Sequence, residues 1–320
     1  MKVHLLSAYS HPTSDYVPRW LYEHSSPGSH ELVSEASQAD LIVFAETYSG
    51  LDPYFFDVIR HPIYQKYPDK CVLYHISDTP QTLCRTISPS AERHQPNLQC
   101  RRSFSYITRL RDNTMMDQSW DITRAPKLLY SFMGDIDTHS SRRRIFELEH
   151  EDSLLLNASG IKVDTMSAND RMNFHKVFIN SILDASFVLC PRGLGPTSMR
   201  LFEAMQLGRV PVIIGDSWLP VAGIDWSSCA IFVNESEIGA IPKLLEDRHA
   251  QASTMGLSAR SIWQSKFSPP QVLSELITLG LELLDVSYGS LERAQDSFAI
   301  AGFKHWRNLG GYAKRNFFYP

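Results

Sequence analysis

The sequence has no long hydrophobic run and few cysteines. No stretch approaches the roughly 18–20 apolar residues of a membrane-spanning helix, and the opening segment MKVHLLSAYSHP turns polar too early for a secretory signal peptide. The cysteines are odd in number, widely spaced and never arranged as CxxC: Cys71, Cys84, Cys100, Cys190 and Cys229. We therefore expect no disulfide framework, no metal site and a soluble, cytoplasmic protein.

Charge of one sign and low-complexity tracts are also missing. The chain has 31 basic and 35 acidic residues, a net charge of -4, so it lacks the basic excess typical of a general nucleic-acid binder. Hydrophobic residues make up 43% and charged residues 21%, as in a globular protein. A length of 320 residues allows one large domain or two of ordinary size.

Short apolar segments alternate with polar, turn-rich segments along the whole chain. In the first 120 residues we predict strands at 3–8, 40–45, 70–75 and 104–108, with helices between them. Residues 109–125 are polar and predict a linker. The second half predicts strands at 127–132, 186–190, 210–214 and 231–233, and helices at 142–148, 171–184, 197–207, 238–245 and 270–284. This alternation indicates two α/β halves with parallel sheets, and the cleft between them is the natural ligand site.

The segment from Ser186 to Asp216 joins a strand, a glycine-containing loop, a helix and a second strand. Pro191 should end the first strand, and the loop carries Gly193 and Gly195. Glycines allow positive φ and a close approach of the backbone to a ligand. The loop therefore predicts a binding site at the start of the helix.

Thr197 and Ser198 can cap that helix, whose N-terminus offers free N–H groups and a positive dipole end. Arg192 and Arg200 add cationic side chains suited to a diphosphate. Arg200 and Glu203 are three residues apart and share a helix face, so Glu203 either pairs with Arg200 or accepts ribose hydroxyls. An ordinary strand–helix–strand unit explains these residues equally well, because the loop is neither GxGxxG nor a Walker A motif.

Several runs of this half resemble the exostosin-type glycosyltransferases, a family of heparan sulfate polymerases and plant cell-wall transferases. The run CPRG…SMRLFEAMQLGRVPVIIGDSWLP matches the family pattern, and Trp226 also fits. Upstream, LYSFMG (129–134) followed by the run SRRR (141–144) resembles the family's F-x-G…R-R-x-L pattern. The resemblance covers residues 127–245, whereas residues 1–120 match only loosely.

The resemblance implies a GT-B fold with two Rossmann-like domains, residues 1–122 on the acceptor side and 123–290 on the donor side. It implies that the helical tail, 291–320, packs back on the N-terminal domain. The implied activity is inverting sugar transfer from a UDP-sugar to a saccharide hydroxyl, in glycan or surface polysaccharide synthesis, with no cofactor or metal required. The donor-binding residues implied are Arg142, Arg143, Arg192, Gly193, Ser198, Arg200, Glu203 and Asp216.

A catalytic base should follow a strand of the N-terminal half. The candidates are His11, Asp15, Glu46 and Asp78, of which we favour Asp78, with His11 second, because Asp78 directly follows the predicted strand KCVLYH. A capping or turn-initiating aspartate is the ordinary alternative.

Two other functions remain open. A GDP-sugar donor, as in a fucosyl-type transferase, fits the same fold, and so does a catalytically inactive nucleotide-sugar-binding protein. Aromatic and basic residues interleave in the tail, which leaves open a peripheral association with the inner face of a membrane.

Overall fold

The computed structural model describes residues 1–10, 16–47, 52–107, 115–121 and 123–301. The chain forms two compact units, each made of more than one segment. Unit 1 contains Met1–Tyr106, Ser217–Ala222 and Ser268–Pro320, and unit 2 contains Ile107–Asp216 and Gly223–Phe267. The boundary near 106 lies earlier than the predicted 122. Within the described residues, no helix is long and apolar enough to cross a membrane.

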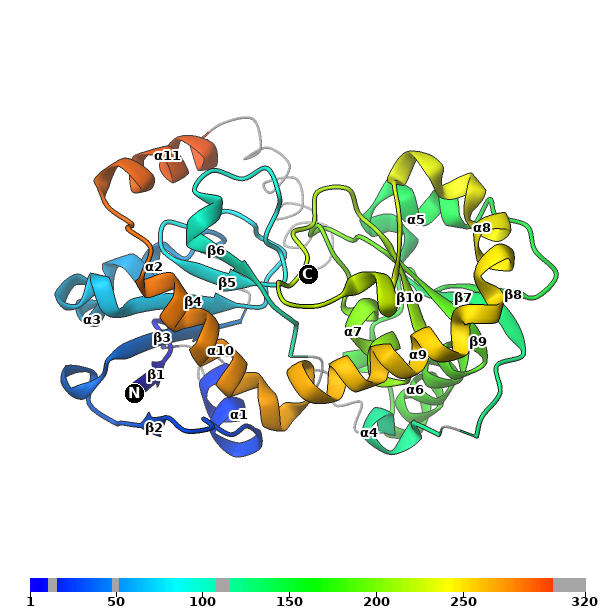
Figure 1. Ribbon diagram of the computed structural model, residues 1–320, viewed down its shortest axis with the longest axis horizontal. Helices are drawn as coiled ribbons and strands as arrows, with labels where there is room; N and C mark the ends of the chain where they lie inside the picture. Colours follow the sequence, from blue (N-terminus) through cyan, green and yellow to red (C-terminus); the bar gives the residue numbers. More distant parts are fainter. Residues whose placement is uncertain (11–15, 48–51, 108–114, 122, 302–320) are drawn as a thin grey trace. The chain divides into compact units, whose positions relative to one another are not determined.

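Unit 1 is built on a six-stranded sheet in the order β2-β1-β3-β4-β5-β6, with every pair parallel (Figure 1). Its strands are β1 (Lys2–Leu6), β2 (Glu31–Leu32), β3 (Leu41–Glu46), β4 (Cys71–His75), β5 (Thr86–Ser88) and β6 (Arg101–Ser103). Its helices are α1 (Tyr16–His24), α2 (Phe56–Arg60), α3 (Pro62–Lys66), α10 (Pro269–Leu284) and α11 (Ser290–Ala301). The sequences of β3 and β4 are almost continuously apolar, because both faces of the sheet are covered.

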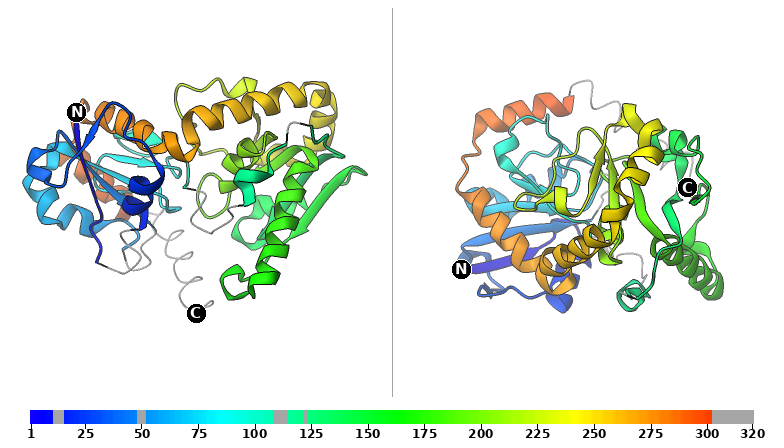
Figure 2. Two further views of the ribbon diagram at one scale, coloured as in Figure 1. Left: turned by 90° about the horizontal axis from the view of Figure 1, so that it is seen from below. Right: turned by 45° about the vertical axis from the view of Figure 1, so that its right-hand side comes forward.

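Helices α1 and α10 pack together on one face of this sheet, while α2 and α3 cover the other (Figure 2). Helix α10 was predicted to belong to the C-terminal domain, but its contacts are with β3, β4, β5 and β6 of unit 1. Its buried stripe includes Leu273, Leu276 and Gly280, and Gly280 lies against Leu41. An amphipathic pattern predicts that a helix has a buried face, but not which sheet that face covers.

Unit 2 is built on a five-stranded parallel sheet in the order β11-β10-β9-β7-β8. Its strands are β7 (Leu128–Gly134), β8 (Ser153–Asn157), β9 (Ala185–Pro191), β10 (Val210–Ile214) and β11 (Ile231–Val233). Its helices are α4 (Met115–Ser119), α5 (Ser140–Ile145), α6 (Ala168–Leu183), α7 (Met199–Gln206), α8 (Ile241–Arg248) and α9 (Ala252–Ile262). Two parallel α/β units confirm the predicted fold class.

Most predicted elements occur within a few residues of their expected bounds, and the exceptions are short or polar. Of the strand expected at 104–108, the described residues 104–107 form none, and β6 lies just before them. Pro191 ends its strand as predicted and is itself the last strand residue, paired with Ile214. The predicted linker contains α4, and β2, β5, β8 and α9 were not predicted. Gly208 follows the end of α7 with a φ of 67°, and an added Cβ would lie 2.7 Å from Nε1 of Trp120.

The segment Ser217–Ala222 leaves the unit 2 sheet and packs in unit 1. Trp218 is 1% exposed and forms an antiparallel bridge with Glu92, while its carbonyl accepts a 2.8 Å hydrogen bond from Nε of Arg93. This segment contains Leu219 and Pro220, which end the run that resembles the exostosin-type pattern, so part of that run belongs to the fold of unit 1.

Candidate functional site

The strand order of unit 2 creates a topological switch point between β7 and β9. The chain leaves β7 toward β8 on one side and leaves β9 toward β10 on the other. Connections that diverge in this way leave a crevice at the carboxyl ends of the two strands, where ligands bind in open α/β sheets. Gly134 ends β7 and Pro191 ends β9, so the predicted donor residues that follow these strands lie at this edge.

Arg142 holds the switch point together through backbone carbonyls. Its Nε donates to the carbonyl of Arg192 at 3.0 Å, Nη1 donates to that of Asp135 at 2.9 Å, and Nη2 donates to that of Pro191 at 3.4 Å. These bonds link the loop after β7 to the loop after β9. Arg142 therefore fixes the shape of the glycine-containing loop after β9, where the sequence predicts a diphosphate site.

Two glycines allow the loop its compact form. A Cβ at Gly193 would lie 3.1 Å from Nη2 of Arg142, and a Cβ at Gly215 would lie 2.5 Å from the carbonyl oxygen of Pro196. Arg192 is joined to the next strand by its backbone N–H, which donates to Ile214 at 2.8 Å. The loop is thus packed closely against the ends of β9 and β10.

Helix α7 begins directly after this loop. Of the two predicted caps, Ser198 is the N-cap, and the Ser198 hydroxyl accepts a 3.3 Å hydrogen bond from the backbone N–H of Arg200. The positive end of the helix dipole therefore lies beside the switch point, which favours an anionic ligand there.

The Arg200 guanidinium is enclosed by two aromatic rings. Its central carbon lies 4.6 Å from the ring centre of Phe178 on α6 and 5.3 Å from that of Phe132 on β7. Nε of Arg200 lies 3.7 Å from Oε2 of Glu203, and both side chains are 13% exposed. Burial lowers the pKa of Arg200, and the nearby Glu203 opposes that shift. The sequence alternatives for Glu203, ion pair or ribose ligand, are compatible with this spacing.

Glu235 belongs to the same edge, and the sequence did not single it out. It follows β11, and its Oε1 lies 3.8 Å from Nη1 of Arg192. Its Oε2 lies 4.0 Å from Nε2 of His139, and its backbone N–H donates to Oδ1 of Asp216 at 2.8 Å. In the sequence, the one feature that could have pointed to Glu235 is its position just after the last strand of the sheet.

The remaining donor-side predictions have exposed side chains. Arg143 is 63% exposed and pairs with Asp137 at 2.7 Å. Asp216 is exposed and follows β10. Of the basic run, Arg142 therefore reaches the loop that precedes α7, whereas Arg143 faces solvent.

Unit 1 repeats the switch-point topology, between β1 and β3. Glu46, the last residue of β3, is 1% exposed and bridges this point, accepting 2.7 Å hydrogen bonds from the Ser7 hydroxyl and the Ala8 backbone N–H. Burial raises the pKa of Glu46 to about 7, against the opposing effect of those two bonds.

Asp78 lies beyond the end of β4, as predicted, and is half-buried. Its Oδ1 accepts a 3.4 Å hydrogen bond from the hydroxyl of Tyr106. His11 and Asp15 lie outside the described residues. Among the residues that the structure does describe, no group of three or more His, Cys, Asp or Glu side chains could hold a metal ion.

Comparison with known families supports the resemblance seen in the sequence. Residues 76–247 match the Exostosin GT47 domain, a range just over half of the chain. The chain belongs to the exostosin GT47 family. The matched range contains every donor-side residue named above and also Asp78, so the GT47 match reaches further toward the N-terminus than the sequence runs indicated.

Individual relatives agree with this membership. The Exostosin-1 homolog of Caenorhabditis elegans is 37% identical over 109 residues, which are 33% of this chain and 28% of that protein. The probable glucuronoxylan glucuronosyltransferase IRX7 of Arabidopsis thaliana is 35% identical over 85 residues, 26% of this chain and 18% of that protein. The chain therefore spans less than a third of the length of these GT47 relatives.

Among solved structures, Anabaena Alr3699/HepE in complex with UDP matches with a TM-score of 0.37 and 8% identity. The match covers 89% of this chain and 99% of that chain. A TM-score this low does not relate the two structures in detail.

Proposed function

We propose that this chain is an inverting glycosyltransferase that moves a sugar from a UDP-sugar to a saccharide hydroxyl, in glycan or surface polysaccharide synthesis. Membership of the exostosin GT47 family supports the reaction class. The observation that carries the proposal is the position of Arg200, in the first turn of α7 beside the β7/β9 switch point.

The donor diphosphate would lie at the start of α7. There the backbone of the Gly193 loop, the helix N-terminus capped by Ser198, and the guanidinium of Arg200 would together bind its negative charge. Arg192 would contribute from the loop, and Glu203 would accept the ribose hydroxyls. Asp216, at the end of β10, would lie toward the donor sugar.

This arrangement favours departure of the nucleoside diphosphate. Negative charge grows on the leaving phosphate as the sugar bond breaks, and preorganised cationic groups stabilise that charge. We expect these groups to suffice without a metal or other cofactor.

Unit 1 would bind the saccharide acceptor, and Asp78 would accept its proton. A general base must sit within hydrogen-bond reach of the attacking hydroxyl, and residues beyond strand ends are suited to that position. The Tyr106 hydroxyl, which donates to Asp78, would orient the carboxylate.

Calorimetric titration with UDP, GDP and their sugars tests the donor site. We expect UDP to bind, and Glu203→Ala to weaken it by roughly 1–3 kcal/mol, the range for lost bonds to a charged acceptor. Glu147→Ala, an exposed carboxylate on the same unit, is the matched control. Binding of GDP in place of UDP would assign a GDP-sugar, and equal UDP affinity of the Glu203 variant would refute the ribose role.

A transfer assay tests the reaction. Asp78→Asn should lower kcat about 10²–10⁴-fold, the usual contribution of a general base, while leaving UDP affinity unchanged. If this variant keeps full activity, the base lies elsewhere, with His11 the next residue to substitute. A wild-type protein that binds UDP but neither transfers nor hydrolyses any donor would be a nucleotide-sugar-binding protein instead.

A further inference from the structure

Arg200 is held by aromatic rings more than by hydrogen bonds. Its Nε and Nη1 are buried, and neither has a hydrogen-bond partner among the residues that the structure describes. The nearest carboxylate, Glu203, lies 3.7 Å from Nε, beyond normal hydrogen-bond distance. A buried guanidinium with so few partners is costly, and such groups in folded proteins call for a specific explanation.

The rings of Phe132 and Phe178 supply part of that explanation. Cations interact favourably with aromatic ring faces, and the interaction strengthens when water is excluded. Phe132 also lies 5.8 Å from the guanidinium of Arg142, so one ring of β7 contacts both arginines at the switch point. Phe178 contacts Arg200 from α6, at 4.6 Å.

We propose that Phe178 and Phe132 form an aromatic clamp that positions Arg200 for the β-phosphate of the donor. This inference rests on the proposed function. The clamp keeps water from the guanidinium, so its charge acts in a low-dielectric environment and attracts the diphosphate more strongly. The diphosphate in turn supplies the counter-charge that Glu203 provides only in part.

Phe178 gives the cleaner test of the two rings, because Phe132 belongs to the buried core of unit 2. Phe178→Leu removes the ring and keeps an apolar side chain, while Phe178→Tyr keeps the ring. Phe174→Leu is the matched control, because Phe174 lies one turn earlier on the same helix, is likewise half-buried, and contacts the ring of His175.

Each variant is titrated with UDP and with uridine, which lacks phosphate. We expect Phe178→Leu to bind UDP roughly tenfold more weakly, the scale of a desolvated cation–π contact, with uridine affinity unchanged. Phe178→Tyr and Phe174→Leu should both retain wild-type UDP affinity. Thermal melting of each variant shows whether the fold survives.

Other outcomes overturn the proposal. Equal UDP affinity of Phe178→Leu and wild type would mean that the ring has no positioning role. If Phe178→Leu weakened uridine binding as much as UDP binding, or if Phe174→Leu weakened UDP binding equally, the effect would come from general destabilisation of α6 and not from the Phe178 ring. If the wild type binds neither UDP nor GDP, the proposed function fails. In that case, titration of the same variants with inorganic pyrophosphate tests the aromatic clamp independently of the proposed function. Weaker pyrophosphate binding in Phe178→Leu alone supports the clamp, and equal binding by all variants refutes it.

Discussion

The carbonyl oxygen of Arg192 accepts a 3.0 Å hydrogen bond from Nε of Arg142, fifty residues earlier in the chain. This bond joins the loop after β7 to the loop after β9 at the switch point of unit 2. It explains why one arginine of a basic run is turned inward while its neighbour Arg143 faces solvent.

Arg142→Ala should destabilise unit 2 by about 1.5–3 kcal/mol, the range for hydrogen bonds to charged groups, because it leaves partly buried carbonyls without their donor. Arg143→Ala removes only an exposed ion pair and should cost under about 1 kcal/mol. Urea unfolding followed by tryptophan fluorescence measures both. If the two variants unfolded at similar urea concentrations, the hydrogen bonds of Arg142 would not be stabilising unit 2 as predicted.

Gly215→Ala should displace the loop before α7, because the new Cβ would lie 2.5 Å from the carbonyl oxygen of Pro196. Overpacking of this kind costs typically about 1–3 kcal/mol. UDP affinity should fall together with the melting temperature. Gly239→Ala is the control, since nothing lies within 4 Å of its added Cβ. If Gly215→Ala bound UDP normally at wild-type stability, the loop would not be fixed by this contact.

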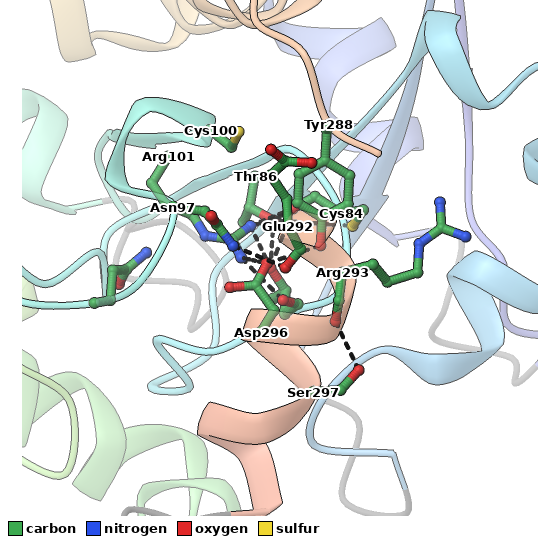
Figure 3. A network of polar contacts seen from close by, with 12 residues as sticks. Cys84, Thr86, Asn97, Cys100, Arg101, Tyr288, Glu292, Arg293, Asp296 and Ser297 are labelled. Atoms are coloured by element: carbon green, nitrogen blue, oxygen red, sulfur yellow. Dashed lines mark hydrogen bonds and ion pairs between the residues drawn. The ribbon is translucent and has the colours of Figure 1, made fainter. Parts of the chain in front are cut away.

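Asp296→Asn should strongly destabilise unit 1. Asp296 lies on α11, is fully buried, and accepts hydrogen bonds from Arg101 at 2.5 Å and from the Tyr288 hydroxyl at 2.7 Å (Figure 3). Removing one charge of a buried pair leaves the other uncompensated, at a cost of about 3–5 kcal/mol.

The control for that change is Glu282→Gln, which removes the exposed carboxylate partner of the half-buried Arg102. Its effect on the free energy of unfolding should stay below about 1 kcal/mol. Thermal or urea unfolding compares the two, and a small effect of Asp296→Asn would mean that α11 is held by its apolar contacts.

Glu46 should make the stability of unit 1 depend on pH. Its pKa in the folded chain is about 7, against an ordinary value of 4.5, so the folded state binds this proton more tightly than the unfolded state. The resulting stabilisation, up to roughly 3 kcal/mol for a shift of this size, is present below about pH 4.5 and is lost as the pH rises toward 7.

Glu46→Gln removes the titrating group and should flatten the free energy of unfolding across this pH window, while Glu147→Gln, an exposed carboxylate, should leave the slope as it is. Urea unfolding at several pH values checks this. A variant with the wild-type slope would assign the pH dependence to another group.

The sequence by itself determined the strand–loop–helix–strand unit from β9 to β10. The cap at Ser198, the glycine at 208 and the apolar runs on either side act on neighbours within a few residues, so their effect can be read from spacing. The family resemblance came from this local run and from a second one at 129–144, for the same reason.

Only the tertiary structure decided the rest of the site. It turned Arg142 inward, brought Glu235 to Arg192, and enclosed Arg200 between rings from α6 and β7. It also assigned α10 and the segment 217–222 to unit 1. These outcomes depend on contacts between residues far apart in the chain. Strand order and the choice of sheet face that a helix covers decide those contacts, and neither of these two properties produces a periodic pattern in the sequence.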